Sequence, residues 1–194
     1  MTTRDDQTGL MNLGAFTFVV DHVIRRASRA GECATILAIK MTVPKAEVAK
    51  SDADPVAVYR VARILRTELR GEDVVARLAP LEFGVALPDT NADGGEIVVN
   101  WITAQLLEHG IGGSGADDPT VSIGRATFEP TYGPVDAAEL LAAARRSHGG
   151  PSHLVGQEGR QPIEAPQDEL AARRSLGEWT ASRRHLRPIR STDT

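Results

Sequence analysis

The chain has 194 residues, of which 41% are hydrophobic and 25% charged, and its formal net charge is −4; these values fit a globular protein with one domain of ordinary size. No apolar run reaches the ~18 residues of a membrane-spanning helix, and the first ten residues lack the basic and apolar segments of a secretory signal. Cys33 is the single cysteine, which excludes an internal disulfide and a thiolate metal cluster, so we expect a cytoplasmic protein.

The first part of the chain predicts two helices separated by a buried strand. Apolar residues fall on one helical stripe between residues 12 and 30, and Gly31 follows as a stop signal. Residues 33–41 read CATILAIKM, a continuous apolar run that predicts a central strand buried on both faces. A second helical stripe runs from Pro55 to Leu69.

The second part predicts a hairpin, a helix, a strand and a last helix. Two strands at 73–79 and 82–88 are joined by a very short connection, and a third helix follows at 94–110. A strand at 120–130 and a helix at 135–147 complete the order. This succession of elements predicts an α/β fold of the α+β sandwich type, with a mixed central sheet flanked by helices.

The composition changes beyond residue 150. We expect one domain at 1–150, a linker at 151–168 rich in Gly, Pro and Gln, and a tail at 169–194 that is helical or disordered. The domain holds 15 Lys and Arg against 20 Asp and Glu, whereas residues 173–190 hold six Arg against one acid, Glu178. The acidic domain argues against a domain built to hold nucleic acid. The basic tail is a candidate for docking on a partner, which could equally be an acidic protein, an anionic membrane surface or nucleic acid. The tail residues expected to contact that partner are Arg173, Arg174, Trp179, Arg183 and Arg184.

Three segments together resemble the GGDEF family, the domain of bacterial diguanylate cyclases. Residues 6–16, DQTGLMNLGAF, resemble the opening signature D-x-L-T-G-L-x-N-R-R-x-F, from which Gln7 and Leu13 depart. Residues 70–90, RGEDVVARLAPLEFGVALPDT, resemble the block R-x-x-D-x-V-A-R-x-G-G-D-E-F-x-V-L-L-P-x-T, and residues 120–126, TVSIGRA, resemble the strand V-T-x-S-I-G-V-A. The resemblance implies an α/β domain with a sheet related to the nucleotidyl-cyclase palm. It also implies an activity in which two facing domains condense two GTP molecules into cyclic di-GMP.

The signature turn departs from that pattern at the positions that the chemistry needs. Where the family has two glycines, this chain has Ala79 and Pro80, and proline offers no N–H to a phosphate. Leu81 stands in place of an acidic metal ligand. Glu82 and Phe83 persist, and we interpret them as a solvated strand-start glutamate and a core aromatic residue.

The other expected ligands are also replaced. The resemblance implies a metal-binding Asp at the end of the first long strand, where this chain has Lys40, and a second acid where it has Thr42. An ammonium group repels Mg²⁺ instead of binding it. The guanine-reading positions fall near Val48 and at Pro55. We therefore predict a degenerate domain without cyclase activity, without catalytic residues and without bound magnesium.

No other pattern predicts a metal site. His148 and His153 flank a Gly-Pro segment, and we interpret both as solvated histidines.

One functional motif of the family is retained. Arg70 and Asp73 form an R-x-x-D pair, separated from the turn by the five residues VVARL. In relatives this motif binds cyclic di-GMP at an inhibitory site, and a guanidinium and a carboxylate suit the phosphate and the guanine edge. The simpler interpretation is that Arg70 ends a helix and Asp73 begins a strand.

Two functional hypotheses remain open. The favoured one is a non-catalytic interaction module of bacterial signalling, with the fold kept as a scaffold for a protein partner. The alternative is a receptor that binds cyclic di-GMP through Arg70 and Asp73, and residual processing of GTP or ATP is a third hypothesis. Because active relatives pair face to face, a homodimer is also an arrangement that the resemblance implies.

Overall fold

The computed structural model describes residues 2–43, 55–112, 119–148 and 153–155. All of them belong to one compact unit, Met1–Glu164. The predicted tail at 169–194, and all of the predicted linker except residues 153–155, lie outside the described residues.

The helices and strands expected from the sequence are all present, and three short elements are additional. The helices are α1 (Leu13–Ala30), α3 (Pro55–Glu68), α4 (Ala92–Glu108) and α5 (Ala137–Arg146), with a short 3-10 helix η1 (Pro130–Tyr132). The strands are β1 (Met11–Asn12), β2 (Ala34–Thr42), β3 (Val74–Ala79), β4 (Glu82–Pro88), β5 (Thr120–Phe128) and β6 (His153–Val155). The elements that the sequence did not predict are β1, η1 and β6, and β6 lies within the segment predicted as a linker.

The strands form one mixed sheet in the order β1-β3-β4-β2-β5-β6. The pairs at the two edges, β1 with β3 and β5 with β6, are parallel, and the inner pairs are antiparallel. Strand β2 lies between β4 and β5, and its residues from Ala34 to Ile39 are all buried. The prediction of a central strand buried on both faces is therefore confirmed.

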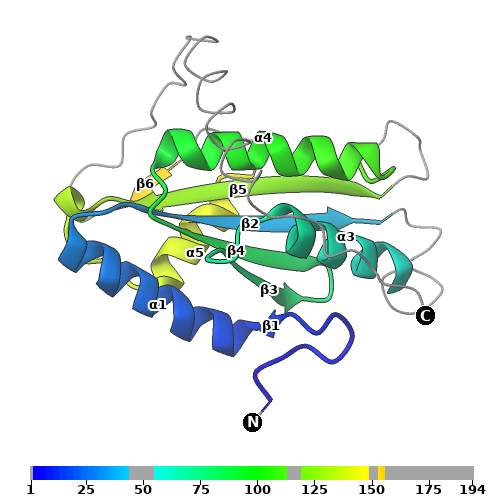
Figure 1. Ribbon diagram of the computed structural model, residues 1–194, viewed down its shortest axis with the longest axis horizontal. Coiled ribbons are helices and arrows are strands. Elements are labelled where there is room, and N and C mark those ends of the chain that lie inside the picture. The colour runs from blue at the N-terminus through cyan, green and yellow to red at the C-terminus, as the bar shows by residue number, and fades with distance from the viewer. Residues whose placement is uncertain (1, 44–54, 113–118, 149–152, 156–194) are drawn as a thin grey trace, which may run out of the picture. The chain divides into compact units, whose positions relative to one another are not determined.

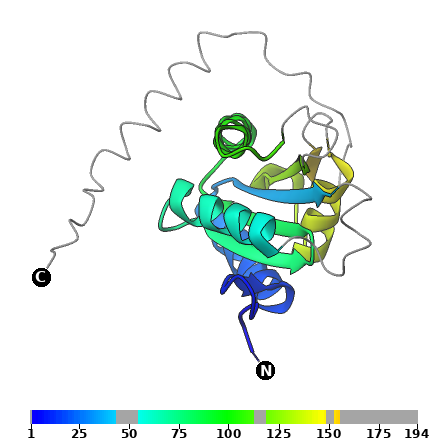
Figure 2. The same cartoon turned by 90° about the vertical axis from the view of Figure 1, so that its right-hand side faces the viewer.

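The alternation of β2 side chains divides the core between the two faces of the sheet. Leu37, Ile39 and Met41 pack with α3 and α4 in one apolar cluster. Ile36 and Ala38 pack with α1 and α5 in the other. Figures 1 and 2 accordingly show α4 and α1 on opposite sides of the sheet. The fold is the expected mixed α/β sandwich.

Helix α1 has a defined start and end. The Asn12 side chain caps its N-terminus by accepting a hydrogen bond from the Ala15 N–H at 3.0 Å. Gly31 ends the helix with a φ of 71°, the left-handed conformation that glycine adopts most readily. The predicted stop at Gly31 is confirmed.

The C-terminal end of α5 lies directly against β5. A Cβ atom added at Gly124 would lie 2.1 Å from the carbonyl oxygen of Ala144, so only glycine allows this approach. The buried Ser147 hydroxyl lies at the same contact and accepts a hydrogen bond from the Arg125 N–H at 2.7 Å. This packing fixes the last turn of α5 beside the sheet.

Among the described residues, no helix combines the length and the apolar character that crossing a membrane requires.

Candidate functional site

The connection between β3 and β4 is a two-residue turn, Pro80-Leu81, flanked by the paired residues Ala79 and Glu82. The ladder shifts register between Arg77 and Ala79 just before the turn. Leu81 is half-buried and packs against the apolar cluster on the α3 and α4 side, and its carbonyl oxygen accepts a hydrogen bond from the Met41 N–H at 2.8 Å. The apolar residue at the turn therefore extends the core.

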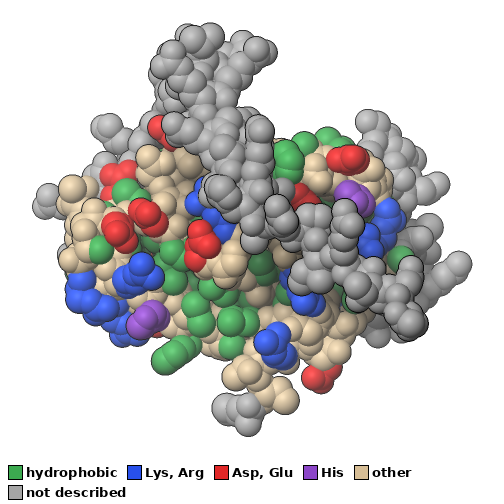
Figure 3. Space-filling view, viewed as in Figure 1, with side chains coloured by type: hydrophobic (Ala, Val, Ile, Leu, Met, Phe, Trp, Pro, Cys, Tyr) green, Lys and Arg blue, Asp and Glu red, His purple; other side chains and the backbone are tan. Residues whose placement is uncertain are grey.

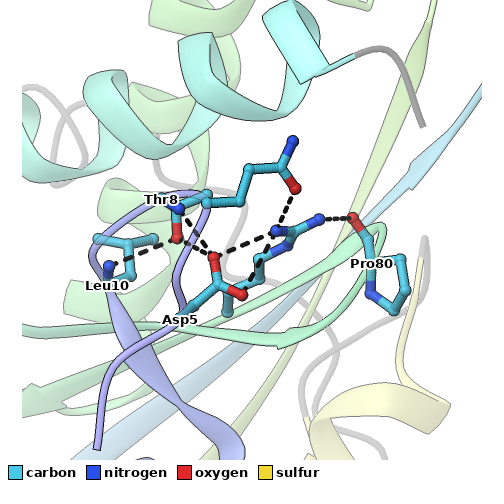
Figure 4. Close-up of polar contacts among 6 residues, drawn as sticks. Asp5, Thr8, Leu10 and Pro80 are labelled. Carbon is cyan, nitrogen blue, oxygen red and sulfur yellow. Dashed lines mark hydrogen bonds and ion pairs between the residues drawn. The ribbon is translucent and has the colours of Figure 1, made fainter. Parts of the chain in front are cut away.

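One arginine joins this turn to the N-terminal segment. The Arg77 guanidinium donates to the Pro80 carbonyl oxygen at 2.9 Å and to the Asp5 carboxylate at 3.1 Å (Figure 4). It also donates to the Gln7 side-chain oxygen, and only 9% of the Arg77 side chain is exposed. The opening signature and the signature turn, 72 residues apart between Asp5 and Arg77, are thus held by one side chain.

Asp5 is the centre of the polar contacts in the N-terminal segment. Its Oδ1 atom accepts hydrogen bonds from the Thr8 N–H at 2.8 Å and the Thr8 hydroxyl at 2.7 Å. Burial alone would raise the pKa of Asp5, but the hydrogen bonds from Thr8 and Arg77 outweigh it and hold the pKa below its ordinary value. The carboxylate is therefore ionised and forms a fixed bridge to Arg77.

The predicted site residues on β2 and β4 lie side by side. Lys40 is paired directly with Glu82 in the antiparallel ladder and with Ser122 on its other side. The Lys40 side chain is exposed, as is that of Thr42 at the end of β2. Lys40, Thr42 and the turn therefore lie at the same end of the strands.

Glu82 is not a solvated glutamate, so that interpretation from the sequence is wrong. Arg145, in the last turn of α5, donates from Nε to Oε1 at 2.6 Å and from a terminal nitrogen to Oε2 at 2.9 Å. Only 18% of the Glu82 side chain is exposed. This two-point contact is the strong form of an arginine–carboxylate pair, and it engages both oxygens of the only carboxylate among the described residues of the turn.

His148 also departs from the solvated state predicted for it. It is half-buried just beyond α5, and its Nδ1 atom is buried without a hydrogen-bond partner. Burial lowers the pKa of His148, the nearby Glu82 carboxylate raises it, and the Lys40 ammonium lowers it further. The side chain of its predicted companion, His153, lies outside the described ones, and no metal-binding group of three or more His, Cys, Asp or Glu occurs in the described part of the chain.

Arg70 and Asp73 lie together in the turn between α3 and β3. The Asp73 carboxylate accepts a hydrogen bond from the backbone N–H of Arg70 at 2.8 Å, and the Asp73 N–H donates to the Arg70 carbonyl at 3.2 Å. The guanidinium of Arg70 makes no hydrogen bond or ion pair with any described residue. Asp73 therefore has a structural task in this turn, while the Arg70 head group is available.

The carboxyl group of Asp73 is poorly solvated. Burial raises its pKa from 3.8 to about 6, against the opposing effects of the Arg70 N–H and the Arg70 charge. Glu72 adds a smaller increase through its own negative charge.

The remaining candidates lie outside the described residues. They are Val48, at a guanine-reading position, and the tail residues Arg173, Arg174, Trp179, Arg183 and Arg184. Pro55, the other guanine-reading position, begins α3.

Three residues of this site were not identified from the sequence. Asp5, Arg77 and Arg145 act through contacts with residues far away in the chain, and the Arg145–Glu82 pair spans 63 positions. No local pattern marks such a contact, because the fold alone brings the partners together.

The mixed sheet lies between two pairs of helices, with the tight β3–β4 turn at one end of its strands, which defines a mixed α/β domain. The family model described as "Diguanylate cyclase, GGDEF domain" matches residues 2–147, so the chain belongs to the GGDEF family. The predicted family membership is confirmed. No curated protein matches the sequence.

Solved GGDEF structures share this fold at low sequence identity. The GGDEF domain of FimX from Pseudomonas aeruginosa is 19% identical with a TM-score of 0.65, covering 76% of this chain and 91% of that one. The GGDEF domain of DgcB from Caulobacter crescentus, solved in complex with c-di-GMP, is 17% identical with a TM-score of 0.63, covering 81% and 94%. The diguanylate cyclase SiaD from Pseudomonas aeruginosa, solved with its activator SiaC, is 20% identical with a TM-score of 0.59, covering 79% and 62%.

Proposed function

We propose that this protein is a non-catalytic GGDEF domain, which acts in the bacterial cytoplasm as a regulatory and protein-interaction module. The observation that carries the proposal is the contact between Glu82 and Arg145. Both carboxylate oxygens of Glu82 are engaged by a guanidinium of the same chain, at 2.6 and 2.9 Å.

The side chains around Glu82 do not fit magnesium. The neighbouring residue on β2 is Lys40, whose ammonium repels a divalent cation, and the adjacent turn residue Leu81 packs against the core. Thr42 is a neutral hydroxyl in place of a second acid. These residues offer no site for the metal ions that would activate the triphosphate of GTP, so we derive no reaction step through a metal here.

The turn itself offers little to a phosphate group. Pro80 has no N–H, and its carbonyl is already bound by Arg77 at 2.9 Å. A phosphate cradle depends on several converging backbone N–H groups with space above them. The fold is retained, but the metal ligands and phosphate-binding N–H groups of the cyclase reaction are not. A protein that serves as a scaffold needs only the fold.

Calorimetric titration with GTP in the presence of Mg²⁺ tests this proposal. The wild-type chain is expected to give no heat of binding, because Glu82, the one carboxylate among the described residues of the turn, is engaged by Arg145. Heat that disappears on addition of a chelator would contradict it.

The geometry of Arg70 favours cyclic di-GMP binding as a second candidate function. Its guanidinium is available, and Asp73 lies beside it with its carboxylate bonded to the Arg70 N–H at 2.8 Å. Binding of cyclic di-GMP that is lost in an Arg70→Ala variant would support a receptor function. The matched control is Arg66→Ala, which removes an exposed arginine from the last turn of α3. Absence of binding by the wild-type chain would eliminate this candidate.

A further inference from the structure

Helix α1 carries two large apolar side chains that are exposed, Leu13 at its first position and Phe18 on its outer face. Phe18 is 72% exposed, the highest value among the large hydrophobic residues described, and Leu13 is 40% exposed. Both lie on the same helix, five positions apart in the sequence. Isolated exposed hydrophobics are common, whereas a cluster beside a groove indicates a binding surface.

A groove runs beside these residues, between the N-terminal segment and the start of α1. Its walls are residues 2–4 on one side and residues 11–15, with Phe18 and Val19, on the other. In the space-filling view, apolar side chains gather over the region of α1 and β1 (Figure 3). The groove is therefore bordered by the two exposed apolar side chains of α1, with Leu13 at the start of the helix and Phe18 on the side away from its buried stripe.

The groove is held open by specific contacts. The side chain of Asn12 donates to the Thr2 carbonyl oxygen at 2.7 Å and also caps α1 through the Ala15 N–H. Arg4 pairs with Met11 in an antiparallel bridge and donates to the Gly9 carbonyl oxygen at 2.7 Å. These bonds fix the N-terminal wall, so the groove does not depend on a partner for its shape.

The other end of the same helix is basic. Arg25, Arg26 and Arg29 are all exposed, and they belong to the last two turns of α1. Asp21 is the only acid within the helix, and its carboxylate accepts a hydrogen bond from the Ala137 N–H at 3.0 Å. Helix α1 thus combines an apolar groove near its start with three exposed positive charges near its end.

We propose that this α1 surface, consisting of residues 2–4, 11–15, Phe18, Val19 and the three arginines, docks an acidic amphipathic helix of a partner protein. Apolar side chains of the partner helix fill the groove around Phe18, and its acidic residues meet Arg25, Arg26 and Arg29. A second copy of this chain is a poor occupant, because the same surface on that copy offers no acidic side chain to meet the three arginines. The proposal rests on the proposed function, since it names the surface and the partner class of the interaction module.

The test uses the full-length chain and a designed peptide as probe. The peptide has about 18 residues, with leucine at helical spacing and glutamate elsewhere, and carries a fluorophore for anisotropy titration. A matched peptide replaces every glutamate by lysine. We expect the glutamate peptide to bind in a salt-sensitive manner and the lysine peptide to bind at least about tenfold more weakly.

Variants locate the binding on the chain. Phe18→Ser is expected to weaken binding of the glutamate peptide by about tenfold or more, because a central aromatic side chain carries much of such an interface. Leu107→Ser, which removes a 50% exposed residue from α4, is the matched control and should leave binding unchanged. An Arg25→Glu, Arg26→Glu double variant should also weaken binding, whereas Arg63→Glu, Arg66→Glu on α3 should not.

Several results would overturn the proposal. They are absence of peptide binding, equal binding of the two peptides, and equal effects of Phe18→Ser and Leu107→Ser. Self-association that is lost in Phe18→Ser, measured by sedimentation, would assign the surface to a second copy instead. The GTP titration separates the two proposals. Missing peptide binding without GTP binding removes only the α1 docking surface. Chelator-sensitive binding of GTP removes the proposed function whatever the peptide does.

Discussion

Glu82 shows how a single contact changes the chemistry of a position. A carboxylate at the start of a strand beside a turn is a ready metal ligand when its oxygens are free. Here Arg145 occupies both oxygens, and Lys40 is the directly paired residue on the next strand. The positive groups next to Glu82 are side chains of the protein itself, so the negative charge of Glu82 is balanced without a metal ion.

The ion pair is expected to contribute measurably to stability. Arg145→Gln leaves the half-buried Glu82 without its partner and should lower the free energy of unfolding by about 1 kcal/mol, within the range for partly exposed pairs with good geometry. Arg146→Gln, an exposed neighbour with no described ion pair, is the control and should change little. Urea unfolding of the two variants measures the difference. Equal stabilities would show that the pair contributes nothing.

Asp73 predicts a pH dependence of stability with a definite sign. Its pKa is raised to about 6 in the folded chain, so the folded state keeps a proton that the unfolded state releases near pH 4. The stabilisation is complete below about pH 4 and is lost as the pH rises through about 6, a change of at most about 3 kcal/mol.

The variant Asp73→Asn removes this titration while keeping a side-chain oxygen for the Arg70 N–H. Its unfolding free energy should therefore fall less than that of the wild type between pH 4 and pH 6. Glu72→Gln removes only the smaller effect of its own charge on the pKa of Asp73, so its curve should stay closer to the wild type than that of Asp73→Asn. If the unfolding free energies of Asp73→Asn and the wild type changed equally with pH, Asp73 would not be the source of the pH dependence.

At the scale of the elements, the position of α5 decides where Arg145 lies. The helix approaches β5 so closely at Gly124 that a methyl group would meet the Ala144 carbonyl oxygen, one residue before Arg145. The same end of the helix is bonded to β5 through Ser147 and Arg125. The charge contact with Glu82 is therefore a consequence of glycine-mediated packing.

Gly124→Ala should accordingly be strongly destabilising. The added methyl group would lie 2.1 Å from a backbone oxygen, so α5 must move away from the sheet, and we expect a loss of about 3 kcal/mol or a chain that does not fold. Gly14→Ala is the contrasting control, because its added Cβ meets only the Asn12 side chain at 3.7 Å and alanine favours a helix. Equal melting temperatures of Gly124→Ala and Gly14→Ala would contradict this account of α5.

At the scale of the whole molecule, the main helices and strands follow from local sequence patterns, whereas the contacts within the site do not. The continuous apolar run of β2 and the helical stripes of α1 and α3 are determined by residues close in sequence, and they were predicted. The turn at Pro80-Leu81 and its neighbours Lys40 and Glu82 were also located, because the family resemblance aligns them along the chain.

The missed features depend on long-range pairing. Strand β1 has only two residues and exists because Met11 and Asn12 pair with β3. The partner of Glu82 comes from a helix 63 positions later, and the bridge from Arg77 to Asp5 spans 72. A residue such as Glu82 therefore looks solvated in the sequence and is paired in the fold.

The central claim is that this GGDEF domain does not make cyclic di-GMP, and product formation tests it most directly. Purified chain is incubated with labelled GTP and Mg²⁺, and the products are separated, with an active GGDEF domain run in parallel as positive control. We expect no cyclic di-GMP and no consumption of GTP above the protein-free background. Formation of cyclic di-GMP that rises in proportion to the amount of this chain would contradict the claim.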